Sequence, residues 1–387
     1  MRNNYHTAMI LSGRTFAGVA CLGVSVFALA FLNLQRTPVV ATAPAANEDS
    51  DEQSGPYEAA VADSIASTKP QQYAVSSTTP QFVLFSFDGS KSVPMLNEIM
   101  AFEQHMKSEG KPVNFTYFIN GVYFVTGATS GTYQGPGEAQ GASNVGFSDT
   151  PQDISSRVAA FNKAFAEGDE IGSHTAGHFN GALWSYDDWS KEFASFNSLI
   201  SNISTNNPSI SADAPSFTPQ NIVGFRAPYL AVNDNLYKTE ADNHYLYDAS
   251  GVNVSDNWPY KDRYGIWHIP LSFIHLGSNS APVIAMDYNL WMRQSHAVEQ
   301  AKRGTPLWDR YYKDVLSAYA SQFDFNYTGN RAPIVIADHF SKWNDGVYWE
   351  AMKSFAENVC GLPNVHCVTF KDLTKYLDTT GVPSAAN

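Results

Sequence analysis

Short apolar runs alternate with longer amphipathic stretches along most of the chain after residue 80. Each apolar run has the length of a buried strand and is bounded by polar or turn-forming residues. The stretches at 153–168 and 348–360 have the periodicity of helices with one buried face. This alternation predicts an α/β fold with a mostly parallel sheet, either open or closed into a barrel. The strands predicted in this way are 81–88, 113–120, 169–174, 222–228, 245–250, 266–271, 333–339 and 366–370.

The N-terminal residues follow a different pattern. Residues 15–35 carry no charge, and Arg2 and Arg14 precede them, which is the arrangement of an export signal. The run is also close to the length that spans a bilayer, and small residues at 43–46 provide a candidate cleavage region. Residues 1–44 are therefore expected to be a cleaved signal peptide or a single-helix membrane anchor. Both alternatives place the remaining chain outside the cytoplasm, as a secreted, periplasmic or membrane-anchored protein.

The remaining chain divides by composition. Residues 45–80 are rich in Ala, Ser, Thr, Glu, Asp and Gln and have few apolar side chains, which predicts a flexible linker. Residues 81–378 contain all the predicted strands and helices and are expected to form one domain. The last residues, 379–387, are expected to be a disordered tail.

Composition and charge exclude one class of function. The chain has 387 residues, of which 44% are hydrophobic and 13% aromatic, so a sizeable core is available. Its net charge of −13 argues against a nucleic-acid-binding protein, which would need a basic face. The three cysteines show no CxxC spacing, which argues against a zinc ribbon or a thioredoxin-like site. An exported protein could join Cys360 and Cys367 in a disulfide, and two unpaired buried thiols are the alternative.

Polar residues stand where several predicted strands end. They are Asp88, His174, Arg226, Asp338 and His339. Functional groups of α/β proteins gather at the carboxyl ends of parallel strands, so these five positions are candidates for one common site.

Each candidate has a chemical use and an ordinary alternative. His174 and His178 are four residues apart, so in a helix they would share a face and could bind one metal ion. Arg226 could hold a carboxylate in a bidentate pair, and His339 could donate a proton. Capping or surface histidines, a surface arginine and a structurally hydrogen-bonded histidine are the corresponding alternatives.

The order of these motifs resembles the polysaccharide deacetylase family, the metal-dependent carbohydrate esterases that include chitin deacetylases. The resemblance covers roughly residues 81–377. The HTAGH segment at 174–178 is similar to the family's metal motif, and RAPY at 226–229 is similar to its arginine motif. The resemblance implies a distorted, incomplete (β/α) barrel. Further segments look closest to the chitin-deacetylase-like branch: YDAS at 247–250, WPYKD at 258–262, GIWHIPL at 265–271, NRAP at 330–333 and ADHFSKW at 337–343.

One departure from the family concerns Asp88. The family's first motif usually has two consecutive aspartates, the first a catalytic base and the second a metal ligand, whereas this chain has SFDG. One alignment makes Asp88 the base and puts Gly89 at the ligand position. The other makes Asp88 the ligand and puts Phe87 at the base position. Both alternatives place Asp88 against the metal or its bound water.

The resemblance also implies a mechanism. A divalent metal, expected to be zinc, would be held by His174, His178 and Asp88 and would activate a water molecule. The backbone N–H at Tyr229 would stabilise the oxyanion, and His339 would protonate the leaving amine.

Several carboxylates could orient His339. Asp338 precedes His339 directly, but neighbours on a strand point to opposite faces. Asp248, Asp256 and Asp287 are the remaining candidates, and the sequence does not rank them.

The expected substrate is an acetylated polysaccharide or oligosaccharide, and Trp343 is the expected wall of a saccharide groove. Three functions fit these features. The first is N-deacetylation of chitin, its oligosaccharides or a related glycan. The second is O-acetyl ester hydrolysis on the same scaffold. The third is glycan binding by a degenerate site that lacks catalysis.

Overall fold

The fold is taken from a computed structural model that describes residues 72–210, 214–253, 256–277 and 280–384. The described residues belong to the compact unit 46–387. The expected signal peptide or membrane anchor, most of the expected linker and residues 385–387 lie outside the described residues. Within the described ranges, no helix combines the length and the apolar character needed to cross a bilayer.

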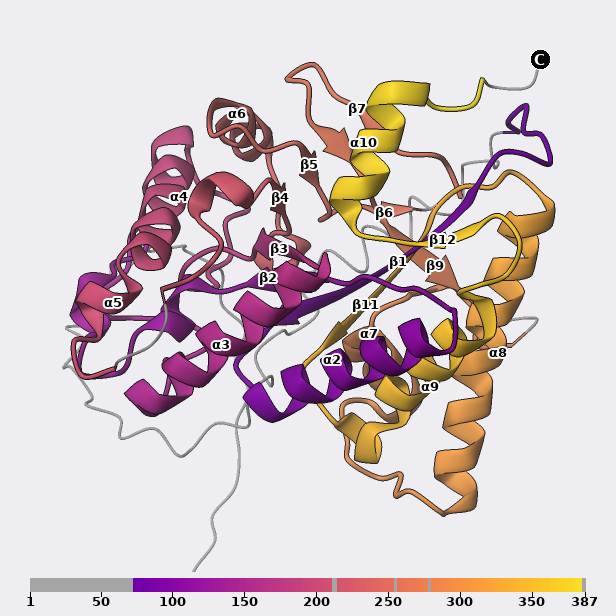
Figure 1. The fold of residues 1–387 in the computed structure, drawn as a ribbon, viewed down its shortest axis with the longest axis horizontal. Helices are drawn as coiled ribbons and strands as arrows, with labels where there is room; N and C mark the ends of the chain where they lie inside the picture. The colour runs from indigo at the N-terminus through magenta and orange to yellow at the C-terminus, as the bar shows by residue number, and fades with distance from the viewer. Residues whose placement is uncertain (1–71, 211–213, 254–255, 278–279, 385–387) are drawn as a thin grey trace, which may run out of the picture. The chain divides into compact units, whose positions relative to one another are not determined.

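One large sheet organises the fold (Figure 1). Its nine strands run in the order β11-β1-β2-β3-β4-β5-β8-β7, and β12 also pairs with β1. All pairings are parallel except the antiparallel pair β7–β8. The strands are β1 (Gln81–Gly89), β2 (Thr116–Ile119), β3 (Glu170–Ser173), β4 (Gly224–Phe225), β5 (Tyr247–Asp248), β7 (Tyr260–Lys261), β8 (Trp267–His268), β11 (Ile334–His339) and β12 (Val365–Cys367).

A second, three-stranded sheet lies beside β11. It contains β6 (Val252–Asn253), β9 (Leu271–Ile274) and β10 (Val283–Ile284). The amide of Val335 donates to Ser272 Oγ, and Ala337 forms an isolated parallel bridge with Met286. The large sheet is therefore curled but not closed. This arrangement confirms the predicted α/β fold of the incomplete-barrel type.

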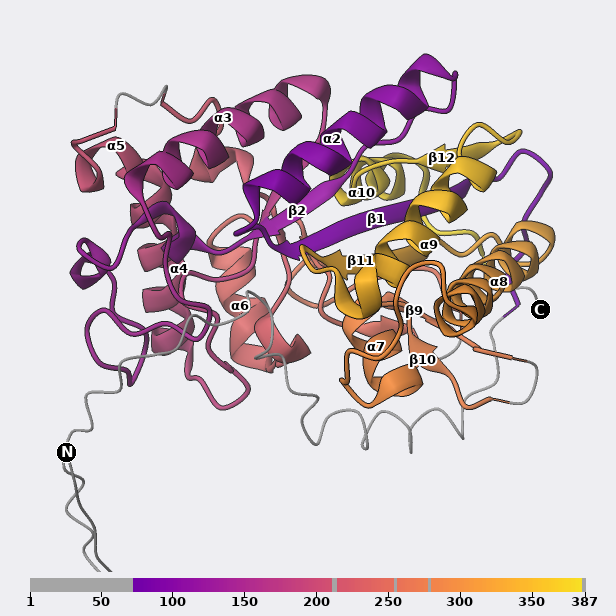
Figure 2. The ribbon, with the colours of Figure 1, turned by 90° about the horizontal axis from the view of Figure 1, so that it is seen from below.

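Helices flank the strands, and Figure 1 shows α3, α2, α9 and α8 one after another along the sheet. Figure 2 shows α8 and α9 packed side by side next to β11, in agreement with their contacts. The helices are α2 (Val93–Ser108), α3 (Pro151–Glu167), α4 (Tyr186–Ser201), α5 (Ile203–Asn206), α6 (Asp234–Asp242), α7 (Asp287–Ser295), α8 (Pro306–Thr328), α9 (Trp343–Val359) and α10 (Phe370–Thr380).

Local sequence signals explain where several helices begin and end. Thr150 and Asp153 form a capping box at the start of α3, and Ser185 and Asp188 form one at the start of α4. Gly168 ends α3 with a φ of 101°, a left-handed conformation that a residue with a side chain adopts at a cost.

Most predicted strands are present, but their ends differ from the predictions. The predicted strand 222–228 is paired only at β4, because Pro228 lacks an N–H and begins a turn. The predicted strand 266–271 is two strands, β8 and β9, in different sheets. Pro270 separates them, since it cannot donate to a ladder hydrogen bond.

β1 lies at the centre of the fold. All nine of its residues are buried, and it pairs with β2, β11 and β12. A strand covered on both faces needs a nearly continuous apolar sequence, which explains the run from Phe82 to Phe87. Ser86 and Asp88 are its only polar residues between Phe82 and Gly89, and both are used in the site described below.

The ends of the described chain pack on this domain. In the described end of the expected linker, the amide of Ala74 donates to Ser384 O, and the Tyr73 hydroxyl accepts from the amide of Trp258. α10 continues to Thr380, which is inside the expected tail.

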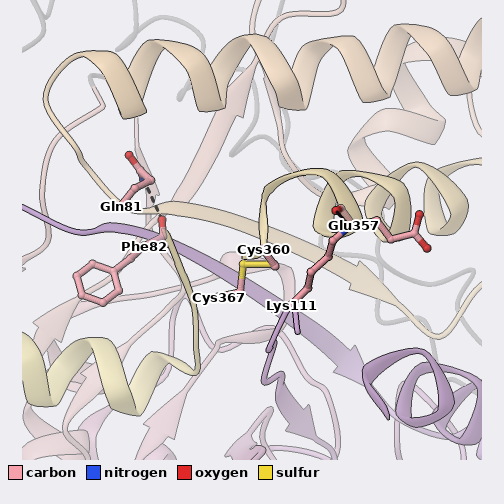
Figure 3. The surroundings of a disulfide bond; sticks show 6 residues. All are labelled: Gln81, Phe82, Lys111, Glu357, Cys360 and Cys367. Atoms are coloured by element: carbon pink, nitrogen blue, oxygen red, sulfur yellow. Dashed lines mark hydrogen bonds between the residues drawn. A yellow bond between two sulfur atoms is a disulfide. The ribbon is translucent and has the colours of Figure 1, made fainter. Parts of the chain in front are cut away.

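A disulfide joins Cys360 to Cys367, with the two Cα atoms 5.7 Å apart (Figure 3). It links the end of α9 to β12, whose residue Cys367 pairs with Val83 of β1. Nearby, Lys111 Nζ donates to Glu357 O, which further attaches α9 to the residues before β2.

We expect removal of this disulfide to destabilise the domain. The bond closes a loop with a sequence separation of 7, so the double variant Cys360→Ala/Cys367→Ala should lower the free energy of unfolding by about 2 kcal/mol through loop entropy. Denaturant unfolding of the variant and of the oxidised wild type measures the difference. Reduced wild type is the control and should match the variant, and equal stability of all three proteins would contradict the expectation.

A second stability effect comes from Glu170, at the start of β3. Burial raises the pKa of Glu170 to about 7, although bonds from Lys371 N, the Tyr247 hydroxyl and the Thr116 hydroxyl oppose the shift. The folded-state pKa lies above the unfolded value, so the folded protein binds this proton more tightly. The resulting stabilisation is fully present below pH 4.5 and is lost as the pH rises through about 7.

The variant Glu170→Gln removes this titration. We expect wild type to lose about 3 kcal/mol of stability relative to the variant as the pH rises from 4.5 to above 7. Urea unfolding of both proteins at several pH values measures the difference, and a pH-independent difference would contradict the expectation.

Candidate active site

The carboxyl ends of adjacent strands bring the predicted residues together. Asp88 of β1 and His339 of β11 are direct register partners on neighbouring parallel strands. Register partners of a parallel pair point to the same face of the sheet. His174 follows β3 and Arg226 follows β4, and these two strands are also neighbours.

Asp88 forms a buried ion pair with Arg226. Arg226 Nη1 lies 2.8 Å from Asp88 Oδ1, and the two side chains are 0% and 1% exposed. The same Nη1 donates to Ser86 Oγ at 2.8 Å, and Nε donates to Ala249 O at 3.1 Å. The guanidinium also lies over the ring of Phe118, at 4.4 Å from its centroid. These contacts fix the Asp88 carboxylate and balance its charge.

The pair differs from the expected bidentate arrangement. Only Asp88 Oδ1 contacts Arg226, because Nη1 is shared with Ser86 and Nε is directed at Ala249. Asp88 Oδ2 is buried and has no hydrogen-bond partner among the described residues. This oxygen is therefore the one that can accept a proton.

His174 and His178 lie next to each other, in a segment without helical structure. The ring centroids are 4.9 Å apart, and both residues are buried. Thr175 and His178 have φ values of 65° and 61°, so turns bring the two rings together instead of a helical face. His174 Nδ1 lies 2.7 Å from Arg226 O, which connects the histidine pair to the ion pair.

The donor set does not fit a metal site with three protein ligands. The described part of the chain contains no group of three or more His, Cys, Asp or Glu side chains arranged to hold a metal ion. Gly89 supplies no side chain, and one oxygen of Asp88 is occupied by Arg226. The structure places the two imidazoles side by side, and the expected ligand set of Asp88, His174 and His178 stays a prediction.

His339 is oriented by Asp287, the first residue of α7. His339 Nδ1 lies 2.7 Å from Asp287 Oδ1, and the His339 amide donates to Asp287 Oδ2 at 2.8 Å. Burial raises the pKa of Asp287, whereas the charge of His339 and hydrogen bonds from His339 and Tyr288 oppose the shift. A carboxylate on Nδ1 leaves Nε2 as the ring nitrogen that carries a transferable proton.

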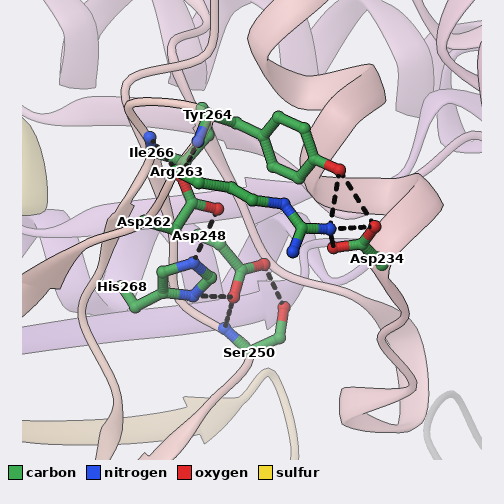
Figure 4. Close-up of polar contacts among 8 residues, drawn as sticks. All are labelled: Asp234, Asp248, Ser250, Asp262, Arg263, Tyr264, Ile266 and His268. Atoms are coloured by element: carbon green, nitrogen blue, oxygen red, sulfur yellow. Dashed lines mark hydrogen bonds and ion pairs between the residues drawn. The ribbon is translucent and has the colours of Figure 1, made fainter.

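The other two carboxylate candidates have different contacts. Asp248 accepts from the amide and the hydroxyl of Ser250 and faces His268, which also contacts Asp262 (Figure 4). The Ser250 hydroxyl in turn accepts from the amide of Ala227, so this cluster supports the backbone of the RAPY segment. Asp256 accepts from Gln322.

Asp338 does not join the site chemically. Its two carboxylate oxygens are buried and have no hydrogen-bond partner among the described residues. Burial raises the pKa of Asp338 well above its usual range, and the nearby charge of Asp287 raises it further. Burial thus disfavours the charged form of Asp338 next to the His339–Asp287 pair.

An aromatic cluster lies beside His339. The Trp343 ring centroid is 5.5 Å from that of His339, and Trp343 stacks on Trp291 at 4.8 Å with nearly parallel planes. Tyr288 packs against Trp343 at 5.7 Å. Trp343 is half-buried, so part of its surface remains accessible.

Tyr229 lies beside the histidine pair. Its ring centroid is 5.1 Å from that of His178, and its hydroxyl accepts from Asn144 Nδ2 at 3.4 Å. Its φ of 58° is unusual for a residue with a large side chain.

Sequence reasoning missed some of these residues. Ser86 precedes Asp88 by two positions and therefore points to the same face of β1, a signal that was available from strand periodicity. Asp287 was one of the three carboxylate candidates, but no sequence signal placed Tyr288 beside Trp343. The contact between Phe118 and Arg226 depends only on the order of the strands in the sheet, so no local sequence signal indicates it.

Searches against protein-family models and against curated proteins find no match. Solved structures do match. A protein described as a polysaccharide deacetylase from Mycobacterium smegmatis is 16% identical, with a TM-score of 0.50 over 82% of this chain and 98% of its own. Peptidoglycan deacetylase PdaC from Bacillus subtilis is 12% identical, with a TM-score of 0.39 over 78% of this chain and 94% of its own.

A family 4 carbohydrate esterase from Streptomyces lividans, solved in complex with acetate, is 14% identical, with a TM-score of 0.38 over 79% of this chain and 98% of its own. The superposition on the Mycobacterium protein agrees with the curled, unclosed sheet described above. The chain therefore has the polysaccharide deacetylase fold.

Proposed function

We propose that the protein is a carbohydrate deacetylase that hydrolyses N-acetyl groups of chitin, chitin oligosaccharides or a related glycan. One observation carries this proposal. Asp88 and His339 are register partners at the ends of adjacent strands, and each is held by a buried partner of opposite charge, Arg226 or Asp287. A fixed carboxylate and a fixed imidazole on one face of a sheet supply a base and an acid for the same reaction.

In the proposed reaction, Asp88 Oδ2 takes a proton from a water molecule, whose oxygen then forms a bond to the acetyl carbonyl carbon. The carbonyl oxygen becomes an oxyanion, which the backbone N–H at Tyr229 stabilises. His339 Nε2 then gives its proton to the amide nitrogen as the C–N bond breaks. The products are acetate and the free amine.

The partners of Asp88 and His339 keep each group in its working state. Arg226 compensates the charge of Asp88 and prevents rotation of its carboxylate. Asp287 stabilises the imidazolium form of His339 through Nδ1, so that the acid is charged when the amine leaves.

The proposed mechanism assigns no step to zinc or another metal. The His174 and His178 rings lie 4.9 Å apart, and these two residues would hold such a metal, with Asp88 as the expected third ligand. They line the site between the Asp88–Arg226 pair and Tyr229.

The substrate would reach the site along the aromatic cluster. Trp343 presents a flat apolar face next to His339, and the C–H groups of a sugar ring pack well on such a face. We propose that Trp343 holds the sugar that carries the acetyl group.

We propose an extracytoplasmic location for the same domain. The Cys360–Cys367 disulfide supports this proposal, because disulfides persist mainly in oxidising compartments. The uncharged N-terminal run of residues 15–35 supports it independently.

A specific observation favours a second candidate function. Without a third protein ligand at Gly89, the site can bind an acetylated glycan beside Trp343 and yet fail to hydrolyse it. The protein would then be a glycan-binding relic of the deacetylase fold.

Acetate release from N-acetylglucosamine oligomers by the full-length protein tests the proposal. We expect His339→Ala to lower the rate of amide hydrolysis by about a hundredfold or more, because the amine needs a proton to leave. Hydrolysis of an O-acetylated sugar should fall much less, because an alkoxide is a better leaving group than an amide anion. His105→Ala, at an exposed position of α2, is the matched control and should leave both rates unchanged.

The results separate the three functions. An equal loss on amide and ester substrates would contradict the role of His339, and activity on esters alone would identify an O-acetyl esterase. Binding of the oligomer without acetate release would identify the glycan-binding protein. Metal analysis of the same preparations tests the expectation of zinc.

A further inference from the structure

The histidine segment 174–178 has an unusual backbone. Thr175 and His178 both have left-handed conformations, with φ values of 65° and 61°. A β-branched or bulky residue adopts this conformation only where the surrounding structure imposes it. The contacts of the segment must therefore include groups that hold this shape.

The carbonyl groups of the segment are bound on one side. Thr175 O accepts from the amide of Gly121 at 3.1 Å, and Ala176 O accepts from the amide of Val122 at 3.0 Å. Both donors belong to the single turn Gly121–Phe124 that follows β2.

Two amide groups of the segment, those of Ala176 and Gly177, are bound by a single carboxylate. Glu192 of α4 accepts from the amide of Ala176 at 2.9 Å and from the amide of Gly177 at 3.0 Å, both at Oε1. The Tyr133 hydroxyl donates to Oε2 at 2.8 Å and fixes the orientation of this carboxylate.

Packing does not explain a glutamate at this position. Glu192 is fully buried, and its neighbours on the buried face of α4 are Trp189, Phe193 and Phe196. No lysine or arginine in the described part of the chain forms an ion pair with it. A buried carboxylate without a cation carries a desolvation cost that an apolar residue would avoid, so its hydrogen bonds must be the reason for its presence.

Gly177 fits the same arrangement. A Cβ atom at Gly177 would lie 2.2 Å from the Tyr133 hydroxyl oxygen. The absence of a side chain at this position therefore gives Tyr133 the space to reach the carboxylate.

We propose that Glu192 is a positioning residue that fixes His174 and His178 relative to each other, with Tyr133 holding the carboxylate in place. The chemical role of the two imidazoles rests on the proposed function. Glu192 imposes the backbone conformation of the segment that carries the two imidazoles, whatever their chemical role.

Hydrogen–deuterium exchange of the full-length protein tests this statement directly. Glu192→Leu keeps the volume of the side chain but leaves the Ala176 and Gly177 amides without an acceptor. We expect exchange in the peptide that contains 174–178 to become about tenfold faster, as the loss of one charge-assisted bond predicts. Glu192→Gln keeps an acceptor for both amides and should restore most of the protection.

The matched control is Glu240→Leu. Glu240 is also a fully buried helical glutamate, but no backbone amide of the described residues donates to it. Exchange at 174–178 should remain as in wild type in this variant. Equal exchange at 174–178 in wild type and Glu192→Leu, or no rescue by Glu192→Gln, would overturn the proposal.

Acetate release provides a second readout. We expect the kcat of Glu192→Leu to fall by about a hundredfold, which is the typical effect of a 1 Å displacement of site groups. If wild type releases no acetate while Glu192→Leu still frees the segment, the proposed function fails and the positioning role stands. Should Glu192→Leu not fold, Tyr133→Phe replaces it, and unchanged exchange at 174–178 in that variant would overturn the proposal.

Discussion

A single arginine joins Asp88, Ser86 and His174 of the site. The Arg226 side chain contacts Asp88 and Ser86 of β1 and the carbonyl of Ala249, after β5. Its backbone amide donates to Ser173 O, and its carbonyl oxygen accepts from His174 Nδ1. Burial of two opposite charges costs several kcal/mol per ion, and this set of contacts offsets that cost. The ends of β1, β3 and β4 and the residue after β5 are therefore joined through one residue.

The same region stores backbone strain. Thr175, His178 and Tyr229 all have positive φ values, although none of them is glycine. Each such residue costs on the order of 1 kcal/mol, and such residues cluster at functional sites. Thr175 and His178 lie in one loop and Tyr229 lies in another, and the rings of His178 and Tyr229 contact each other. The packing of the large aromatic core therefore offsets the free-energy cost of these loop conformations.

The sequence predicted the fold class, because hydrophobic periodicity reveals each strand and helix from local residues. It also predicted which strand ends meet, because functional groups gather at the carboxyl ends of parallel strands. It placed Asp88, His174, Arg226 and His339 at one sheet edge. It could not choose among three carboxylates for His339, because that choice depends on how α7 packs against β11. It also could not predict how the two imidazoles of the 174–178 segment are placed, for a similar reason.

In that histidine segment, hydrogen bonds from distant residues of α4 and from the turn after β2 determine the backbone, and spacing alone does not. Glu192 itself carries no recognisable signal, since a single glutamate in an amphipathic helix is normally exposed. The strands predicted at 222–228 and 266–271 had wrong ends, and the residues responsible, Pro228 and Pro270, could be seen in the sequence. The sequence therefore predicts which residues form the site better than it predicts which residues hold them.

The central position of β1 has a consequence for the order in which the protein can fold. Gln81, at its start, bonds to Ala332, which is 251 residues later, and the strand is also paired with β12 near the end of the chain. A chain that emerges from its N-terminus exposes β1 long before these partners exist. Contacts of such high sequence separation slow folding, and an unpaired apolar strand is prone to aggregation. β1 must therefore be protected from aggregation until residues 334–367 have been synthesised.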